Sequence, residues 1–222
     1  FRVMMCLFAA VPLIVINAGI SRLNIPLING TDFGIIYTLI IIPIGIIGAS
    51  TTFNFLAGFN GLEASQGILI LSALSLVAYF SGNSWLALIG LCMVFALIAF
   101  WLFNKFPAKI FPGDVITYPI GGMISILAIL GNMEKIAVFF FIPYIIEVFL
   151  KSRGKLMKQS FGKPNKDGSL DLPYEKIYGL EHVSIWILKR IKNKVYEKDV
   201  VYFINGIQII FIILGLLIFG GG

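Results

Sequence analysis

The chain has 222 residues, of which 59% are hydrophobic and 13% carry a charge, and its formal net charge is +6. A soluble globular domain has about 25% charged residues. This composition therefore excludes a soluble globular domain and predicts an integral membrane protein. The two cysteines, Cys6 and Cys92, both lie in apolar stretches, which excludes a disulfide framework or a cysteine metal site.

Apolar stretches follow one another along almost the whole chain. A run of about 18 or more apolar residues is long enough for a helix that crosses the hydrocarbon core. We therefore predict an all-α polytopic membrane protein, a single membrane domain over residues 1–222 with about seven transmembrane helices. The predicted spans are residues 3–20, 33–53, 66–81, 85–103, 115–130, 135–150 and 200–219.

Short polar segments connect the first six spans. Residues 21–32, with Pro26 and Gly30, predict a small extracytoplasmic loop, in which Asn29-Gly30-Thr31 matches the glycosylation pattern. Residues 81–84 and 131–134 contain Gly and Asn and predict tight turns.

The basic residues are concentrated before the last span. Twelve of the 17 Lys and Arg lie between Lys151 and Lys198. Because short loops rich in Lys and Arg stay in the cytoplasm, residues 151–199 predict a cytoplasmic loop within the membrane domain. Threading seven spans then puts residues 54–63 and 103–114 on the same face. We expect this basic segment to contact the lipid bilayer, not nucleic acid.

The cytoplasmic loop has predicted substructure. Residues 162–168 favour a turn, and residues 158–161 and 169–172 predict the two short strands of a β-hairpin around it. Residues 181–196 predict an amphipathic helix along the inner membrane surface, and His182 is expected to be a surface or interfacial residue. The predicted apolar face of that helix consists of Val183, Ile187, Leu188 and Ile191.

Residues 54–63, Asn-Phe-Leu-Ala-Gly-Phe-Asn-Gly-Leu-Glu, are unusually polar for a link between two membrane helices. Gly58 and Gly61 let the backbone approach a ligand closely. Asn54 and Asn60 each offer a donor and an acceptor, which suits a uracil edge, and an amide oxygen also suits Mg²⁺. A polar turn with helix caps is the alternative interpretation.

Residues 103–115, Phe-Asn-Lys-Phe-Pro-Ala-Lys-Ile-Phe-Pro-Gly-Asp-Val, form the second polar link on this face. Asp114 falls where a helix enters the membrane. A carboxylate there can cap the helix N-terminus, or it can hold a hard cation that bridges phosphates. Phe111 lies three residues earlier and offers a flat face to a base.

These two segments resemble the signatures of the polyprenyl-phosphate N-acetylhexosamine-1-phosphate transferases, Asn-x-x-Ala-Gly-x-Asn-Gly-Leu-Glu and Asn-x-x-Pro-(Ala/Ser)-x-x-Phe-x-Gly-Asp. The resemblance is closest to the archaeal and eukaryotic branch, as is the run of residues 167–174. It implies transfer of GlcNAc-1-phosphate from UDP-GlcNAc to a polyprenyl (dolichyl) phosphate with release of UMP, at the start of lipid-linked glycan synthesis. It also implies Mg²⁺ or Mn²⁺ and the cytoplasmic face of an archaeal plasma membrane.

The same resemblance assigns roles to residues. Asn54 and Asp114 would be catalytic and would ligate the metal. Gly58, Asn60 and Phe111 would hold the uracil.

The family carries Arg and His near the diphosphate, but residues 155–161 here read Lys-Leu-Met-Lys-Gln-Ser-Phe. Lys158 or Arg153 would supply the positive charge instead, which leaves the sugar uncertain. Glu63 is expected to be a cap, a buried partner or a support for the site. Glu147, inside a predicted span, is expected to form a structural pair, with a role near the lipid or sugar as the alternative.

The chain begins at Phe1 and resembles the C-terminal portion of a family that has about ten spans. The family's Asp-Asp-x-x-(Asp) cluster would lie upstream of Phe1. We therefore expect this segment alone to be inactive and the full protein to be an enzyme.

Other interpretations remain open at this point. The substrate could be undecaprenyl phosphate or another UDP-amino sugar. An ion-coupled transporter would use Glu147, Asp114 and Glu63 as its ion pathway, and a structural membrane subunit would have no catalysis. The family often forms homodimers.

Overall fold

The structure is a computed structural model that describes residues 2–25 and 28–219. Its helices are α1 (Arg2–Val15), the π-helix η1 (Tyr37–Ile41), α2 (Ile42–Phe55), α3 (Leu62–Phe80), α4 (Ser84–Asn104), α5 (Gly113–Leu130), α6 (Glu134–Phe140), α7 (Ile142–Arg153), α8 (Leu180–Ile191) and α9 (Glu197–Phe219). Its strands are β1 (Arg22–Ile25), β2 (Ile28–Asp32), β3 (Lys163–Pro164) and β4 (Leu170–Asp171).

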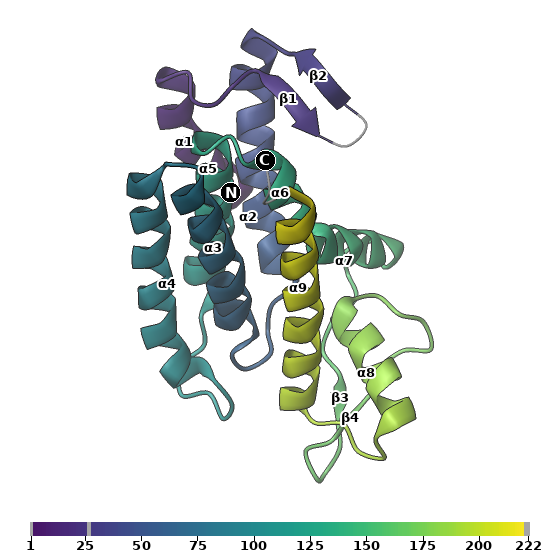
Figure 1. Cartoon of the computed structure of the whole chain (residues 1–222). Coiled ribbons are helices and arrows are strands. Elements are labelled where there is room, and N and C mark those ends of the chain that lie inside the picture. The colour runs from purple at the N-terminus through teal and green to yellow at the C-terminus, as the bar shows by residue number, and fades with distance from the viewer. Residues whose placement is uncertain (1, 26–27, 220–222) are drawn as a thin grey trace.

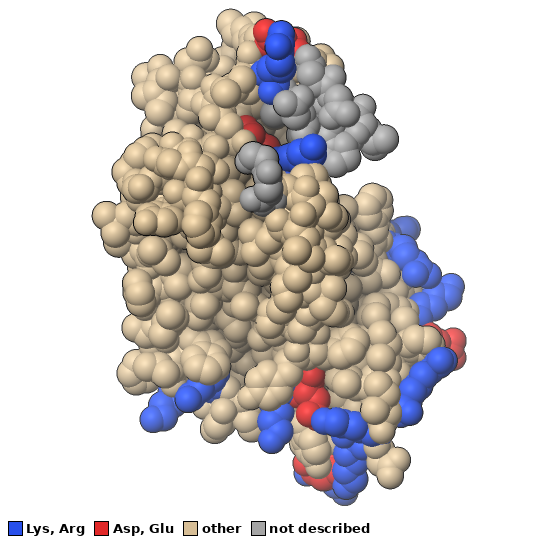
Figure 2. Space-filling model, in the orientation of Figure 1, with Lys and Arg blue, Asp and Glu red and all other residues tan. Residues whose placement is uncertain are grey.

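The long helices α2, α3, α4, α5 and α9 run side by side, and α7 lies across their direction (Figure 1). Within the described residues, five helices are long and apolar enough to cross a membrane, and α1 is a shorter apolar helix. Figure 2 shows a broad uncharged belt between two ends that carry the Lys, Arg, Asp and Glu residues visible from this side. The prediction of a mainly helical membrane protein is confirmed. The five candidate spans are Tyr37–Phe55, Leu62–Phe80, Ser84–Asn104, Gly113–Leu130 and Glu197–Phe219.

The prediction of one continuous helix over residues 135–150 is wrong. Helix α6 ends at Phe140 and α7 starts at Ile142, with Pro143 in its first turn. Proline has no N–H and its ring clashes with the carbonyl four residues earlier, so an unbroken helix through Pro143 would be strained. The break lets α7 leave the direction of the bundle (Figure 1).

The segment expected to be a small loop at residues 21–32 contains an antiparallel strand pair instead. Arg22 pairs with Asp32, and the register shifts between Leu23 and Asn24. Pro26, and the side chains of the predicted glycosylation triplet at residues 29 and 30, lie outside the described residues.

The predicted β-hairpin in residues 151–199 is present, but its first strand is Lys163–Pro164 and not residues 158–161. The backbone N–H of Asn165 donates to the Ser169 carbonyl at 2.8 Å, and Gly168 donates back to Asn165 at 3.0 Å. This closes the turn over residues 165–168, within the segment predicted to turn.

The predicted amphipathic helix ends at Ile191, five residues early, and its buried face differs from the prediction. Ile191 is 74% exposed, whereas His182 is fully buried, so the expectation of a surface histidine is wrong. Helix α8 packs against α7 and α9, and these contacts decide which side is buried. The buried residues of α8 are Leu180, Glu181, His182, Ser184, Ile185 and Leu188.

Helices α2 and α5 pack closely, and this packing positions the site. A Cβ on Gly121 would lie only 2.5 Å from the Ala49 carbonyl oxygen and 2.6 Å from Cα of Ser50. Small residues allow such backbone approach between membrane helices. Ser50 is one turn before Asn54, and Gly121 is two turns after Asp114, so the close approach brings those two side chains together.

Candidate active site

Asn54 and Asp114 meet where α2 ends and α5 begins. The Asn54 amide nitrogen Nδ2 donates to Asp114 Oδ1 at 2.9 Å and to Thr117 Oγ1 at 2.7 Å. Thr117 is 1% exposed, and its hydroxyl also donates to the Gly113 carbonyl at 3.3 Å. Residues 60 positions apart in the sequence therefore form one polar cluster at the edge of the apolar core.

The oxygen atoms of this cluster fit a hard cation. Mg²⁺ takes few protein ligands, typically one or two carboxylates, and completes its shell with water and substrate phosphates. Within residues 2–25 and 28–219, no group of three or more His, Cys, Asp or Glu side chains could hold a metal ion. The Asp114 carboxylate would hold such an ion together with groups from the substrate, and the Asn54 amide, which presents its nitrogen to Asp114, would turn to offer its oxygen.

The loop between α2 and α3 needs its two glycines. Gly58 has φ +121° and Gly61 has φ +81°, in a region that residues with a Cβ rarely adopt. A Cβ on Gly61 would lie 3.2 Å from Cα of Lys105, so this glycine also lets the loop pack on the end of α4.

Two glutamates hold the backbone of this loop. Glu63 Oε1 accepts the Gly58 N–H at 2.6 Å, and Glu63 is 2% exposed. Glu197, the first residue of α9, accepts the Asn60 N–H at 2.5 Å and the Asn60 side-chain Nδ2 at 3.2 Å. The loop N–H groups of Gly58 and Asn60 are thus occupied by carboxylates.

Two aromatic residues considered for the site, Phe111 and Phe161, are both exposed but differ in what they contact. Phe111 is 63% exposed and lies three residues before Asp114, which leaves its ring accessible to a base. Phe161, which follows α7, packs on Gly58. A Cβ added to Gly58 would lie 2.2 Å from the Phe161 ring. The Phe161 ring also meets the Phe59 ring edge-on at 6.1 Å.

Lys151 contacts the C-terminal end of α2. Its Nζ donates to the Phe55 carbonyl and lies 3.4 Å from Glu147 Oε1. A cation at a helix C-terminus is favourable because it bonds unpaired carbonyls and opposes the negative end of the dipole. Of the predicted phosphate residues, Lys158 lies over the Tyr174 ring at 5.0 Å, and Arg153 is exposed at the end of α7.

Glu147 forms the structural pair that the sequence suggested. It is fully buried, and its Oε2 accepts the Leu180 N–H at 2.6 Å. A Cβ added to Gly179 would lie 3.1 Å from Glu147 Oε1 and 2.7 Å from Glu181 Oε2. The two carboxyl groups are therefore neighbours. Burial, and then the Glu147 carboxylate, raise the pKa of Glu181 well above its usual range.

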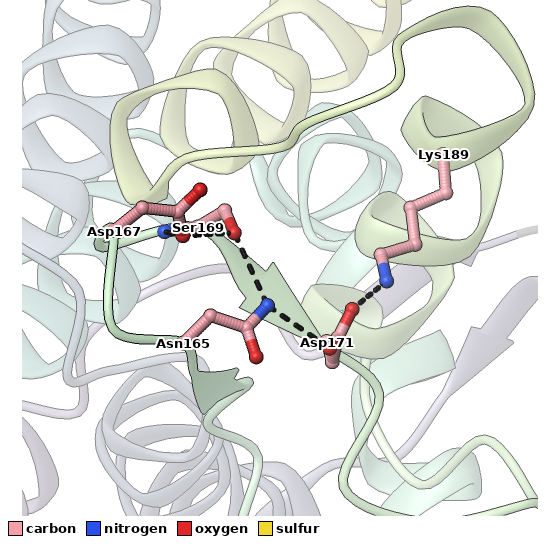
Figure 3. Close-up of polar contacts among 5 residues, drawn as sticks. All are labelled: Asn165, Asp167, Ser169, Asp171 and Lys189. Atoms are coloured by element: carbon pink, nitrogen blue, oxygen red, sulfur yellow. Dashed lines mark hydrogen bonds and ion pairs between the residues drawn. The ribbon is translucent and has the colours of Figure 1, made fainter.

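A second polar cluster, in the hairpin, does not belong to this site (Figure 3). Asn165 Nδ2 donates to Ser169 and Asp171, Ser169 donates to Asp167, and Lys189 pairs with Asp171. These residues line a hollow of about 420 Å³. Lys194 lies 2.7 Å from Asp167 and holds its pKa below the usual range, so both carboxylates are already paired with lysines. The cluster fastens the hairpin to α8 and to the segment before α9.

Sequence reasoning missed four residues at the site: Thr117, Lys151, Phe161 and Glu197. Thr117 had a usable signal, because a residue three positions after Asp114 shares its helix face. The other three come from segments 96 or more residues away from their partners, and no local pattern in the sequence indicates such contacts.

Comparison with known proteins identifies the family to which this chain belongs. The family model for glycosyl transferase family 4 matches residues 1–132, which include both polar loops. The chain belongs to glycosyl transferase family 4.

Relatives of this glycosyl transferase family 4 chain include two archaeal proteins named as UDP-N-acetylglucosamine–dolichyl-phosphate N-acetylglucosaminephosphotransferases. The protein of Saccharolobus solfataricus is 40% identical over 98% of this chain and 66% of its own length. The protein of Sulfolobus acidocaldarius is 34% identical over 97% of this chain and 64% of its own length. The chain thus spans slightly less than two thirds of these relatives. A phospho-N-acetylmuramoyl-pentapeptide-transferase of Clostridium perfringens is 33% identical over 57% of this chain and 40% of its own length.

Proposed function

We propose that the protein transfers GlcNAc-1-phosphate from UDP-GlcNAc to a dolichyl-type polyprenyl phosphate and releases UMP. The observation that carries this proposal is the contact between Asn54 and Asp114 at one end of a helical membrane bundle. Family membership supports a sugar-phosphate transferase, and neither the family nor the relatives described above support the ion-coupled transporter.

The archaeal relatives favour UDP-GlcNAc and dolichyl phosphate over the bacterial substrates. Their similarity extends over 98% and 97% of the chain, which takes in most of residues 133–222, whereas that of the Clostridium perfringens protein covers 57%. The basic loop, where sugar and phosphate recognition is expected, is therefore shared with proteins named for UDP-GlcNAc. Transfer to undecaprenyl phosphate is the second candidate.

The reaction needs positioning more than covalent work by the protein. An oxygen of the lipid phosphate attacks the β-phosphorus of UDP-GlcNAc, the bond from that phosphorus to the bridging oxygen breaks, and UMP leaves with that oxygen. Mg²⁺ held by Asp114 and Asn54 would neutralise phosphate charge and stabilise the leaving oxygen. Phe111 would stack on the uracil, and the loop of Gly58 and Asn60 would hold its edge.

The polar loops and residues 151–196 lie at one end of the bundle (Figure 1), where Lys and Arg are numerous in Figure 2. We propose that this end faces the cytoplasm, because Lys- and Arg-rich loops stay there and nucleotide sugars are found there. We also propose that α1 and the α6–α7 pair are embedded beside the five candidate spans.

An apolar hollow of about 340 Å³ along α2 suits the isoprenoid chain. It is bordered by α2, α5, α6 and α7, and it extends from Tyr37 to Thr52, two residues before Asn54. Gly45 and Gly48 have no heavy atom within 4 Å of an added Cβ, so this strip of α2 has room beside it. We propose that the lipid chain lies there with its phosphate toward Asp114.

Replacing Gly48 with Leu is therefore expected to narrow the lipid groove without a clash. Transfer to a long polyprenyl phosphate should fall about tenfold, while transfer to a short-chain analogue changes little. Gly206→Leu on α9 is the matched control, because its added Cβ also meets no atom within 4 Å. Initial rates with both acceptors measure the effect, and equal losses for long and short chains would contradict this groove.

The proposed function is tested with the whole protein in lipid, incubated with Mg²⁺, a polyprenyl phosphate and radiolabelled UDP-GlcNAc. We expect labelled lipid and stoichiometric UMP, both abolished by a chelator. UMP release only with another UDP-sugar would change the substrate, and no UMP with any donor would overturn the proposal.

A further inference from the structure

Glu197 makes a contact with Asn60 that differs from the other carboxylate contact in the same loop. Glu63 accepts backbone N–H groups, among them that of Gly58. Glu197 accepts both the backbone N–H and the side-chain Nδ2 of Asn60, through its two oxygens. It reaches across 137 positions from the start of α9.

This contact decides which way the Asn60 amide points. A carboxylate offers only acceptors, and of the two ends of an amide only the nitrogen donates. The Asn60 nitrogen must therefore face Glu197, and Oδ1 must point away from it. Oδ1 is buried and accepts no hydrogen bond from the part of the chain that the structure describes.

A buried acceptor without a donor is costly unless a ligand supplies the donor. We propose that Glu197 is a positioning residue for base selection, which fixes the Asn60 amide so that Oδ1 meets the N3–H of uracil. Cytosine has an unprotonated N3, which would face this oxygen without a proton between them. The inference rests on the proposed function, in which Asn60 holds the uracil.

Oδ1 is buried in this structure, so a base reaches it only after neighbouring groups move. Phe161 packs on Gly58 and Phe59, the two residues before Asn60. Phe161 belongs to the basic segment that also contains the hairpin and α8. Helix α9, which begins at Glu197, follows α8 in the chain. Neither hydrogen bond between Glu197 and Asn60 involves Phe161, so this contact does not depend on the position of that ring.

Glu197→Gln is the deciding variant. Glutamine can donate to Asn60 Oδ1, which lets the amide turn and present Nδ2 to the base, and Nδ2 suits N3 of cytosine. With the whole protein, competition of UDP and of CDP against labelled UDP-GlcNAc gives the ratio of the two affinities. We expect this ratio to fall about tenfold in E197Q, because a site that hydrogen-bonds a group discriminates strongly against its absence.

Glu63→Gln is the matched control, because Glu63 holds the loop backbone without touching the Asn60 amide. E63Q should weaken UDP and CDP alike and leave their ratio unchanged. An unchanged ratio in E197Q, or an equal fall of the ratio in E63Q, would overturn the inference while leaving the proposed function intact. A wild-type protein that binds neither nucleotide would overturn both.

Asn60→Ala provides a second variant if melting curves show that E197Q is unfolded. It removes the amide without changing Glu197, so the preference for UDP over CDP should fall by a similar factor. An unchanged preference in N60A would overturn the inference.

Discussion

Replacing Asp114 with Asn is expected to reduce sugar-phosphate transfer by about 10³-fold or more while the protein stays folded. Asparagine has nearly the same shape, and its Oδ1 can still accept the hydrogen bond that Asn54 donates at 2.9 Å. What disappears is the negative charge with which Asp114 would hold the cation. UMP release measures the loss, and a melting curve of the purified variant measures folding.

Two further variants make this test specific. Thr117→Val keeps the charge and removes one acceptor of the Asn54 amide, so activity should fall about 10- to 100-fold, as for supporting residues of metal sites. Asp32→Asn removes a carboxylate at the opposite end of the bundle, next to Ser21, and should leave activity unchanged. A D114N protein with more than a tenth of the wild-type rate would exclude Asp114 as a metal ligand.

Replacing Lys151 with Met is expected to destabilise the protein by about 3–5 kcal/mol, because it leaves a buried carboxylate without its cation. Glu147 is fully buried and Lys151 is 15% exposed in its side chain. The same change removes the hydrogen bond to the Phe55 carbonyl at the end of α2. The melting temperature of the purified protein should fall by about 10 °C.

The double variant Lys151→Met with Glu147→Gln should recover at least half of this loss, because the charge that lacked a partner is then gone. Lys155→Met is the matched control on an exposed lysine of the same segment, and its melting temperature should stay within about 1 °C of the wild type. A K151M protein as stable as the wild type would show that the pair contributes nothing.

The hydrophobic pattern determined the helices. Apolar runs predicted α2 to α5 and α9 to within a few residues, since length and hydropathy alone decide whether a helix can cross a bilayer. The predicted first span, residues 3–20, is too long, because α1 ends at Val15 and is only a shorter apolar helix. The broken sixth helix was missed although Pro143 was visible in the sequence, because hydropathy does not record the missing N–H. The motif residues Asn54 and Asp114 were also identified from the sequence, and the structure puts them in contact. Their metal-binding role stays a prediction.

Only the tertiary structure decided how the site is supported. Gly121 permits the close approach of α2 and α5. Lys151 and Glu197 contact Phe55 and Asn60 from positions 96 and 137 residues further along the chain. The buried face of α8 was predicted wrongly because α7 and α9 bury Glu181 and His182, against the periodicity of apolar residues. Helix formation depends on neighbours within one turn, which the sequence records directly. Contacts over 90 or more residues depend on how whole helices pack, and no local pattern encodes that packing.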